Sequence, residues 1–409
     1  MLKSTPPAAQ DQSSIVQPVT AGILAAVVGF SSSFAVVLQG LAEVGASPQE
    51  AVSGLLILCV GQGVLAIVLA LRYRQPISIA WSTPGAALLI GNGIPQGGFG
   101  VAVTAFLITN GLIVFAGLWR PLSRAVSAIP LSIASAMLAG VLMELCLAPV
   151  RAVHQVPGLA LPIVLAWAVG WCISRRYAVL IAVAMTIVIV ALTSAMPTGS
   201  LNSLQPRLVF VEPVFDLLPA AGIAIPLFIV TMASQNVPGL AVLKSNGYDA
   251  PFGKLFVWTG LSSIVTALFG GHGINLSAIT AALCAGPEAG ADTAKRYLAS
   301  ISAGVVYIML GLFAGFAAAF IAASPPILIQ AVAGLALLSS LIAALATALA
   351  HEEHRLAAMV TFITAVSGIS ILGVGAAFWG LLAGGFLLLL EGGVEQFKDR
   401  KSVKGRVRS

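Results

Sequence analysis

The chain has 409 residues, of which 59% are hydrophobic and only 8% are charged, which excludes a water-soluble globular protein. Its formal net charge of +6 lies in short loops and in the C-terminal tail, so it indicates membrane topology and gives no support for a nucleic-acid partner. The four cysteines lie in apolar runs without metal-ligand spacing and predict neither a metal site nor redox chemistry.

Apolar segments recur along the whole chain. A membrane-spanning helix needs about 20 apolar residues, or fewer where the span is broken. We therefore predict an all-α polytopic membrane protein with about 14 spans. The spans are expected near residues 18–40, 51–71, 77–92, 99–119, 126–148, 158–174, 177–195, 216–240, 254–269, 271–286, 297–321, 326–349, 356–372 and 374–395.

Basic residues test this number of spans, because Lys and Arg are enriched in cytoplasmic loops. Residues 1–17 are polar and show no cleavable signal peptide, so we place this tail in the cytoplasm. Of the 20 Lys and Arg residues, 18 then fall inside, six of them in the basic tail 397–409, and only Arg151 and Arg207 fall outside. A miscounted span would destroy this asymmetry. We expect both termini in the cytoplasm.

The third and tenth spans are interrupted. Gln75 to Pro84 is extended in character before a short apolar helix, and Gly270 to Gly273 is too rich in glycine for a stable helix. We predict a short strand and a half-helix in each. Fourteen spans divide into two halves of seven, so a duplicated unit would be an inverted repeat, as in many secondary transporters. Paired breaks at membrane depth indicate a substrate site, because such backbone is tolerated only inside protein or along a cavity.

The starts of the two half-helices carry the first candidates for substrate binding. Helix N-termini offer free N–H groups and a positive dipole end, which bind anions. The candidates are Ser82, Thr83, Gly85, Gly273, Asn275 and Ser277. Ser and Asn are also common helix caps, so these residue types fit a purely structural role as well.

Polar residues inside the first and eighth spans are further candidates. Ser32 belongs to a triple serine in an apolar run, and Gln235 and Asn236 interrupt another. Serine hydroxyls in membrane helices often bond only to their own backbone, whereas buried amides cost more when they are unpaired. We take all three as candidate substrate ligands beside that structural alternative.

Two ionisable residues are candidates for proton coupling. Glu144 lies near the outer end of the fifth span, where an acid is a functional candidate by default, although it is close enough to the surface to reach water. His272 lies in the broken tenth span and titrates near neutral pH unless its surroundings shift it. A packed, hydrogen-bonded histidine is the alternative.

Enzyme motifs find no support in the sequence. The segment from His351 to Arg355 looks like a metalloprotease signature, but its second histidine follows the first by three positions instead of four, so we predict a solvated loop. The glycines between residues 91 and 100 match no nucleotide-binding pattern. We predict a transporter and not an enzyme, with no cofactor or metal and with a proton gradient as its energy source.

The segment from Gly270 to Glu288, which begins Gly-Gly-His-Gly-Ile-Asn-Leu-Ser-Ala-Ile-Thr, resembles the signature of the bacterial benzoate:proton symporter family, and so does the turn from Trp81 to Gly85. The resemblance extends over nearly the whole chain. It implies the fold of uracil and sulfate-permease type carriers, in which the broken spans hold short antiparallel strands and their half-helices flank the substrate.

The same resemblance implies a core domain that moves against a gate domain, as in an elevator mechanism. The core would comprise residues 18–122 and 213–323, and the gate residues 123–212 and 324–396. The expected partners are a small aromatic acid, protons and the lipid bilayer of the bacterial inner membrane. A homodimer is left open.

One departure from the uracil carriers bears on the substrate. Those relatives place acids in the eighth and tenth spans, where this chain has Gln235, Asn236, Asn275 and Ser277. A neutral pocket suits an aromatic carboxylate, because an acidic side chain would repel it. The main hypothesis is therefore import of benzoate or a similar acid with a proton, which the substrate itself could bring. An uncoupled anion channel or exchanger on the same fold is the alternative.

Overall fold

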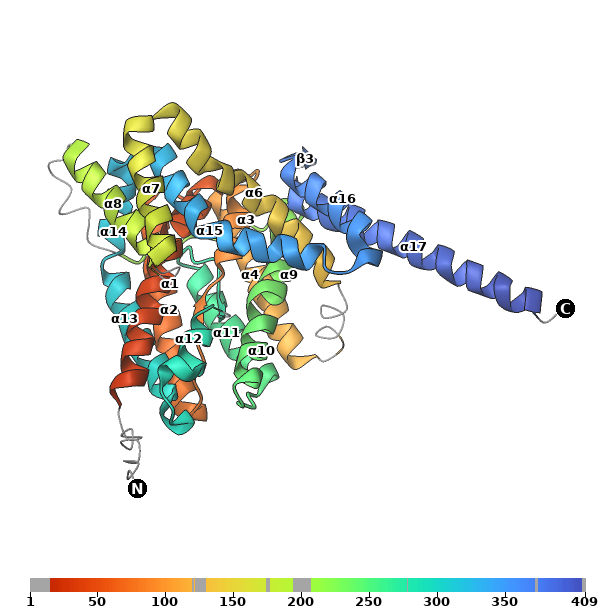
Figure 1. Ribbon diagram of the computed structural model, residues 1–409, viewed down its shortest axis with the longest axis horizontal. Helices are drawn as coiled ribbons and strands as arrows, with labels where there is room; N and C mark the ends of the chain where they lie inside the picture. The colour runs from red at the N-terminus through yellow and green to blue at the C-terminus, as the bar shows by residue number, and fades with distance from the viewer. Residues whose placement is uncertain are drawn as a thin grey trace, which may run out of the picture.

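The computed structural model describes residues 15–119, 121, 130–173, 177–193, 207–277, 279–371 and 374–406. Within them the chain forms apolar helices and two pairs of very short strands (Figure 1). Apart from short 3-10 turns, the elements are α1 (Val16–Glu43), α2 (Pro48–Tyr73), β1 (Ile79–Trp81), α3 (Thr83–Ile90), α4 (Phe99–Leu118), α6 (Leu131–Gln155), α7 (Pro157–Ile173), α8 (Ala178–Thr193), α9 (Leu217–Thr231), a π-helical turn (Met232–Asn236), α10 (Val237–Ser245), α11 (Phe252–Ala267), β2 (Ile274–Leu276), α12 (Ile279–Ala285), α13 (Tyr297–Leu312), α14 (Ala314–Ala323), α15 (Pro326–Ala348), α16 (Arg355–Val366), β3 (Ser370–Ile371), β4 (Val374–Gly375) and α17 (Ala376–Arg406).

Many of these helices have the length and composition of membrane spans. Among the described residues, α1, α2, α4, α6, α15 and the joined segment α9–α10 are long and apolar enough to cross a bilayer. The pair of α13 with its preceding turn and α14 passes the same test together, with a bend of 57°. The mostly helical, polytopic fold is confirmed. The number of 14 spans and the inverted repeat stay predictions.

The interruption of the third and tenth spans is confirmed. The predicted span 77–92 consists of β1 followed by α3, and the span 271–286 consists of β2 followed by α12. β1 and β2 pair with each other in antiparallel register, with Ala80 opposite Asn275. The two breaks are therefore joined in one small buried sheet, although they lie far apart in the sequence.

The predicted eighth span, 216–240, is not one regular helix. α9 ends at Thr231, the turn Met232–Asn236 is π-helical, and α10 continues from there to Ser245. A π turn widens the helix by one residue and is frequent at functional sites. Here it coincides with the polar Ser-Gln-Asn interruption and places Asn236 against β2.

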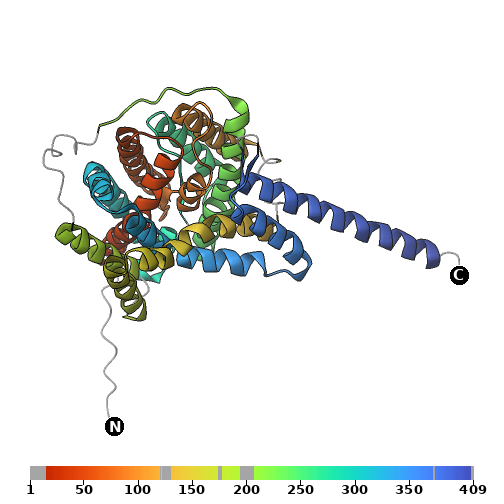
Figure 2. The same ribbon diagram turned by 90° about the horizontal axis from the view of Figure 1, so that it is seen from above.

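Two sets of helices pack mainly among themselves. α1 and α2 pack on α13, and α4 packs on α11 and α9, whereas α6 packs on α15 and α16. Figure 1 shows α1, α2 and α13 upright side by side and α15 and α17 running across the view, and Figure 2 shows α17 projecting from the body of the molecule. α2 and α13 approach closely, because a Cβ atom on Gly63 would lie 2.5 Å from the Gly304 carbonyl oxygen.

Candidate functional site

The first half-helix begins at a serine whose hydroxyl group takes part in two hydrogen bonds. Ser82 is the N-cap of α3, and its Oγ accepts a hydrogen bond from the Gly85 N–H at 3.0 Å. Pro84 in the first turn lacks the N–H that would be unpaired there. Thr231 Oγ1 donates to the same Ser82 Oγ at 3.1 Å and so ties α3 to the end of α9. The cap thus fixes the half-helix and joins two elements.

His272, from the second broken span, hydrogen-bonds to the same turn. Its Nε2 donates to the Ser82 carbonyl oxygen at 3.0 Å, because a carbonyl can only accept, and the ring is buried against Phe106. The next residue, Gly273, has a φ of +143°, and a Cβ atom there would lie 2.9 Å from Asn110 Oδ1. Both residues therefore shape the turn before β2. For His272, this packed and hydrogen-bonded setting corresponds to the structural alternative to proton coupling that the sequence analysis named.

The second broken span is held by neighbouring side chains. Ser263 Oγ accepts from the Ile274 N–H at 2.8 Å and donates to the Ile274 carbonyl at 2.9 Å. Asn236 Oδ1 accepts from the Leu276 N–H at 3.1 Å. Ser277 Oγ accepts from the Thr280 N–H at the start of α12, at 3.3 Å. All of these bonds satisfy backbone groups that would otherwise be unpaired inside the protein.

Asn275 differs from its neighbours on β2. Its side chain is 1% exposed, and its Oδ1 atom is buried with no hydrogen-bond partner in the structure. Gln235, on the π turn, is also buried. Buried amides are normally hydrogen-bonded, so an orphaned amide oxygen beside a half-helix is a feature that calls for an explanation. Among the predicted residues that the structure describes, Asn275 shares this property with His272, whose Nδ1 atom is also buried without a partner.

An aromatic cluster lies next to β1. The Trp81 N–H donates to Gln62 Oε1 at 2.7 Å, and Trp81 Nε1 donates to Ser33 Oγ at 2.9 Å. The Trp81 ring centroid lies 5.8 Å from that of Phe30 and 6.2 Å from that of Tyr307. The sequence reasoning missed the roles of Gln62, Thr231 and this cluster. Only Gln62 carried a visible signal, as an amide in an otherwise apolar helix.

Three predicted residues have surroundings that bear on their roles. A Cβ atom on Gly85 would lie 2.7 Å from Leu227 Cδ1 and 2.8 Å from Ser82 Oγ, so protein atoms fill the space beside it. Ser32 Oγ donates to the Gly29 carbonyl at 3.1 Å, as the structural alternative expects. Thr83 is only partly buried at the first turn of α3.

Glu144 lies away from this cluster of contacts. It forms an ion pair with Arg151 on α6, and its side chain is 61% exposed. The structure therefore places the two proton-coupling candidates in opposite settings, one at the surface and one buried behind Ser82.

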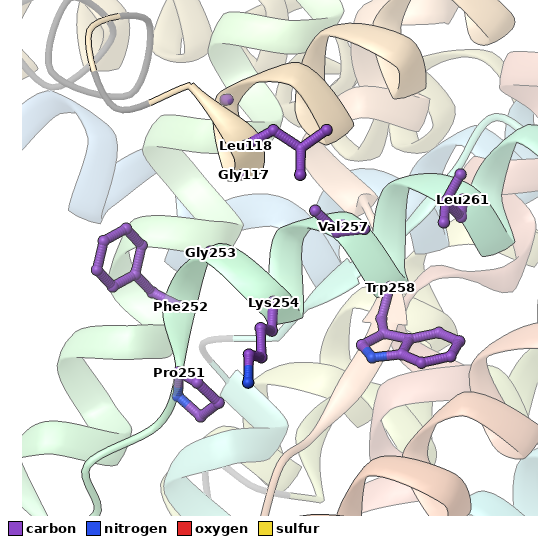
Figure 3. Close-up of a pocket in the computed structure, with 10 residues that line it drawn as sticks. Gly117, Leu118, Pro251, Phe252, Gly253, Lys254, Val257, Trp258 and Leu261 are labelled. Carbon is purple, nitrogen blue, oxygen red and sulfur yellow. The ribbon is translucent and has the colours of Figure 1, made fainter.

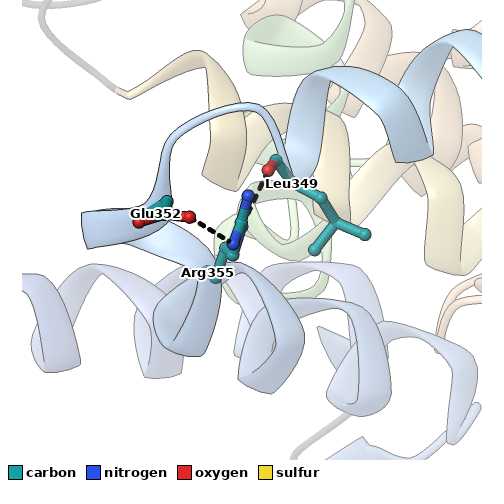
Figure 4. A network of polar contacts seen from close by, with 3 residues as sticks. All are labelled: Leu349, Glu352 and Arg355. Carbon is teal, nitrogen blue, oxygen red and sulfur yellow. Dashed lines mark hydrogen bonds and ion pairs between the residues drawn. The ribbon is translucent and has the colours of Figure 1, made fainter.

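The segment from His351 to Arg355 is an exposed turn. Arg355 Nη1 donates to Glu352 Oε1 at 3.0 Å, and its Nε donates to the Leu349 carbonyl at 3.1 Å (Figure 4). These contacts link the end of α15 to the start of α16. Within the described residues, no three His, Cys, Asp or Glu side chains gather closely enough to hold a metal ion.

The sequence of this chain matches known proteins over most of its length. A family model described as "Benzoate membrane transport protein" matches residues 12–390. The chain belongs to the benzoate membrane transport protein family. Family membership makes it a membrane transporter and not an enzyme. Two relatives are the "Inner membrane protein YdcO" of Escherichia coli strain K12, 40% identical over 89% of this chain and 93% of the relative, and the "Benzoate membrane transport protein" of Acinetobacter baylyi, 30% identical over 89% and 92%.

Solved structures with the same fold are anion transporters of low sequence identity. The transmembrane domain of the cyanobacterial bicarbonate transporter BicA has a TM-score of 0.57 and is 14% identical, over 92% of this chain and 97% of that domain. Murine Slc26a9, an anion transporter solved in the inward-facing state, has a TM-score of 0.61 and is 14% identical, over 94% and 69%. This likeness shows that the chain has the fold of these membrane transporters, as its broken spans predicted.

Proposed function

We propose that this protein imports benzoate or a related aromatic carboxylate, together with a proton, across the bacterial inner membrane. The observation that carries the proposal is the β1–β2 pairing, which brings the start of α3 together with Asn275 and the aromatic cluster around Trp81. The names of the two relatives, one a benzoate transporter and one an inner membrane protein, supply the substrate class and the location.

The electrostatics of the site favour an anion with an aromatic body. The side chains that hydrogen-bond to the strands and to the start of α3 are those of Gln62, Thr231, Asn236, Ser263 and His272. None of them is acidic, so none repels a carboxylate, and the first turn of α3 presents the positive end of its dipole. The rings of Phe30, Trp81 and Tyr307 offer apolar and edge-to-face contacts to a benzene ring.

Transport requires that these residues become accessible. Ser82 is 1% exposed, Asn275 1% and Ser277 5%, so a substrate cannot reach them unless packed elements separate. We infer that the core residues 18–122 and 213–323 move against the gate residues 123–212 and 324–396. The preferential packing of α1, α2 and α13 together, and of α6 with α15 and α16, supports this division. From the distribution of basic residues we propose that both termini lie in the cytoplasm.

The proton is assigned to the substrate or to His272. Glu144 is exposed and paired with Arg151. Among the described residues, the side chains that hydrogen-bond to the strands and to the start of α3 include no carboxylate. The same observation favours the second candidate function, an uncoupled anion channel or exchanger, because such a protein needs no proton-carrying group at its site.

Uptake by liposomes containing the purified protein tests the proposal. Radiolabelled benzoate should accumulate against its gradient when the outside is made acidic, and sulfate, bicarbonate and uracil should not compete. Benzoate movement that only equilibrates, with or without the pH gradient, would favour the channel or exchanger. His272→Gln and Glu144→Gln separate the proton routes: loss of accumulation with retained benzoate exchange in His272→Gln assigns the proton to His272, and retained accumulation in both variants assigns it to the substrate.

A further inference from the structure

A groove of about 520 Å³ lies between the end of α4 and the start of α11 (Figure 3). The two helices touch here through glycine. A Cβ atom on Gly117 would lie 2.6 Å from the Gly253 carbonyl oxygen, and one on Gly253 would lie 2.8 Å from the Gly117 carbonyl oxygen. The backbones therefore meet, and the groove opens beside the crossing between larger side chains.

The floor and the walls of the groove are apolar. They are formed by Ala116, Leu118, Val257, Leu261 and the ring of Phe252. Leu118, Phe252 and Leu261 are 69%, 46% and 47% exposed, and large apolar side chains exposed side by side are typical of a surface that faces lipid. An acyl chain is the complementary occupant for such a surface.

The mouth of the groove carries a cation and an aromatic N–H donor. Lys254 and Trp258 are one helical turn apart on α11 and project on the same side of it (Figure 3). Trp258 is 47% exposed, and Lys254 is exposed without an acidic partner among the described residues. Trp and Lys at a helix end are the anchors typical of the membrane–water interface. The basic-residue pattern assigns this end of α11 to the cytoplasm.

We propose that this groove binds one anionic phospholipid of the cytoplasmic leaflet. Its phosphate is held by Lys254 Nζ and the Trp258 indole N–H, and one acyl chain runs along Val257 and Leu261. The positive charge at an otherwise apolar groove selects an anionic headgroup over a zwitterionic one. The lipid would brace α4 against α11, the two helices that hold the turn before β2 through Asn110 and Ser263.

Native mass spectrometry of the full-length protein in detergent tests this site. Phosphatidylglycerol and phosphatidylcholine with identical acyl chains are titrated separately, and the affinity of the first bound lipid is read for each. The parent protein should bind phosphatidylglycerol about five-fold more tightly, which corresponds to one Lys near an anionic headgroup. Lys254→Gln should remove that preference and leave phosphatidylcholine binding unchanged, whereas Lys254→Arg should retain it.

Lys244→Gln is the matched control, because Lys244 is an exposed lysine at the end of α10, which the charge pattern places on the same side. It should bind both lipids like the parent. Equal affinity of the parent for the two lipids would overturn the proposal, and so would an equal loss in Lys244→Gln and Lys254→Gln. A dimer that Trp258→Ala dissociates would also overturn it, since a second copy of the chain would then cover the groove.

Discussion

Both broken spans place non-helical backbone inside the protein, and different side chains pair its polar groups in each. In the first, Ser82 within the break caps α3 through the Gly85 N–H, and Thr231 and Gln62 from other helices bond to Ser82 and to the Trp81 N–H. In the second, glycines give the chain its turn, and the strand is fastened from outside by Ser263 and Asn236. A helix cap within the segment can be predicted from the local sequence. Hydrogen bonds from side chains on other helices cannot, because they depend on how the helices pack. Each break leaves buried side-chain atoms without a partner in the described structure: the Gln75 amide oxygen and the Ser78 hydroxyl in the first, and the Asn275 amide oxygen on β2 in the second.

The largest effect is expected from Asn275→Asp. A carboxylate at this buried position would lie beside the substrate anion, and an uncompensated buried charge costs about 3 kcal/mol or more. Benzoate uptake at neutral pH should therefore fall on the order of 100-fold. Acidification should restore part of it, because the protonated side chain is neutral like the parent amide.

Gln49→Glu provides the charge control for this variant. It adds the same charge at an exposed position in the first turn of α2 and should leave uptake unchanged. Normal transport by Asn275→Asp, with the protein folded and inserted, would remove Asn275 from the substrate site.

A smaller but distinct effect is expected from Ser263→Ala, which tests the external fastening of β2. The substitution leaves both the N–H and the carbonyl of Ile274 without partners in a buried strand, and each lost partner costs about 1–3 kcal/mol. Thermal unfolding in detergent should show a lowered Tm, with uptake reduced in parallel. Ser262→Ala, one residue away and partly exposed, should unfold like the parent. An unchanged Tm in Ser263→Ala would mean that the β1 pairing and the Asn236 bond hold the strand without Ser263.

The two capping serines give the next comparison. Ser82 Oγ takes part in two hydrogen bonds, whereas Ser277 Oγ accepts one bond of 3.3 Å. Ser82→Ala should weaken benzoate binding by about 1 kcal/mol, and Ser277→Ala by less, since one neutral hydrogen bond is worth about that much. Isothermal calorimetry on the two purified variants and the parent measures the difference. A larger loss in Ser277→Ala would place the substrate nearer to α12 than to α3.

Sequence reasoning reached the broken spans because their causes are local. Glycine and proline disfavour helix wherever they stand, and Ser82 before Pro84 is a capping pattern in any context. The family was predicted correctly for the same reason, since its signature is the run of residues at the second break. The polytopic fold itself followed from the apolar segments that recur along the whole chain.

The remaining features of the site come from contacts between distant segments. Nothing around Thr231 reveals that its hydroxyl reaches Ser82, and hydropathy does not distinguish a π turn from a regular helix. Sequence reasoning also could not show that Leu227 from α9 packs beside Gly85, where a Cβ atom would lie 2.7 Å from Leu227 Cδ1. Gly85→Leu would therefore disturb the packing of α3 on α9 and does not isolate substrate binding.

The smallest effect is expected from Glu144→Gln. The exposed ion pair with Arg151 contributes about 0–1 kcal/mol to stability. Accumulation of benzoate driven by a pH gradient should remain at the level of the parent, because an ion pair that contributes so little to stability is not needed to hold the paired half-helices. Arg151→Gln breaks the same ion pair but keeps the Glu144 carboxylate. It therefore distinguishes the effect of losing the ion pair from the effect of losing the carboxylate. If Glu144→Gln loses accumulation but keeps benzoate exchange while Arg151→Gln keeps both, then Glu144 carries the proton from the surface, and the coupling group lies outside the paired half-helices.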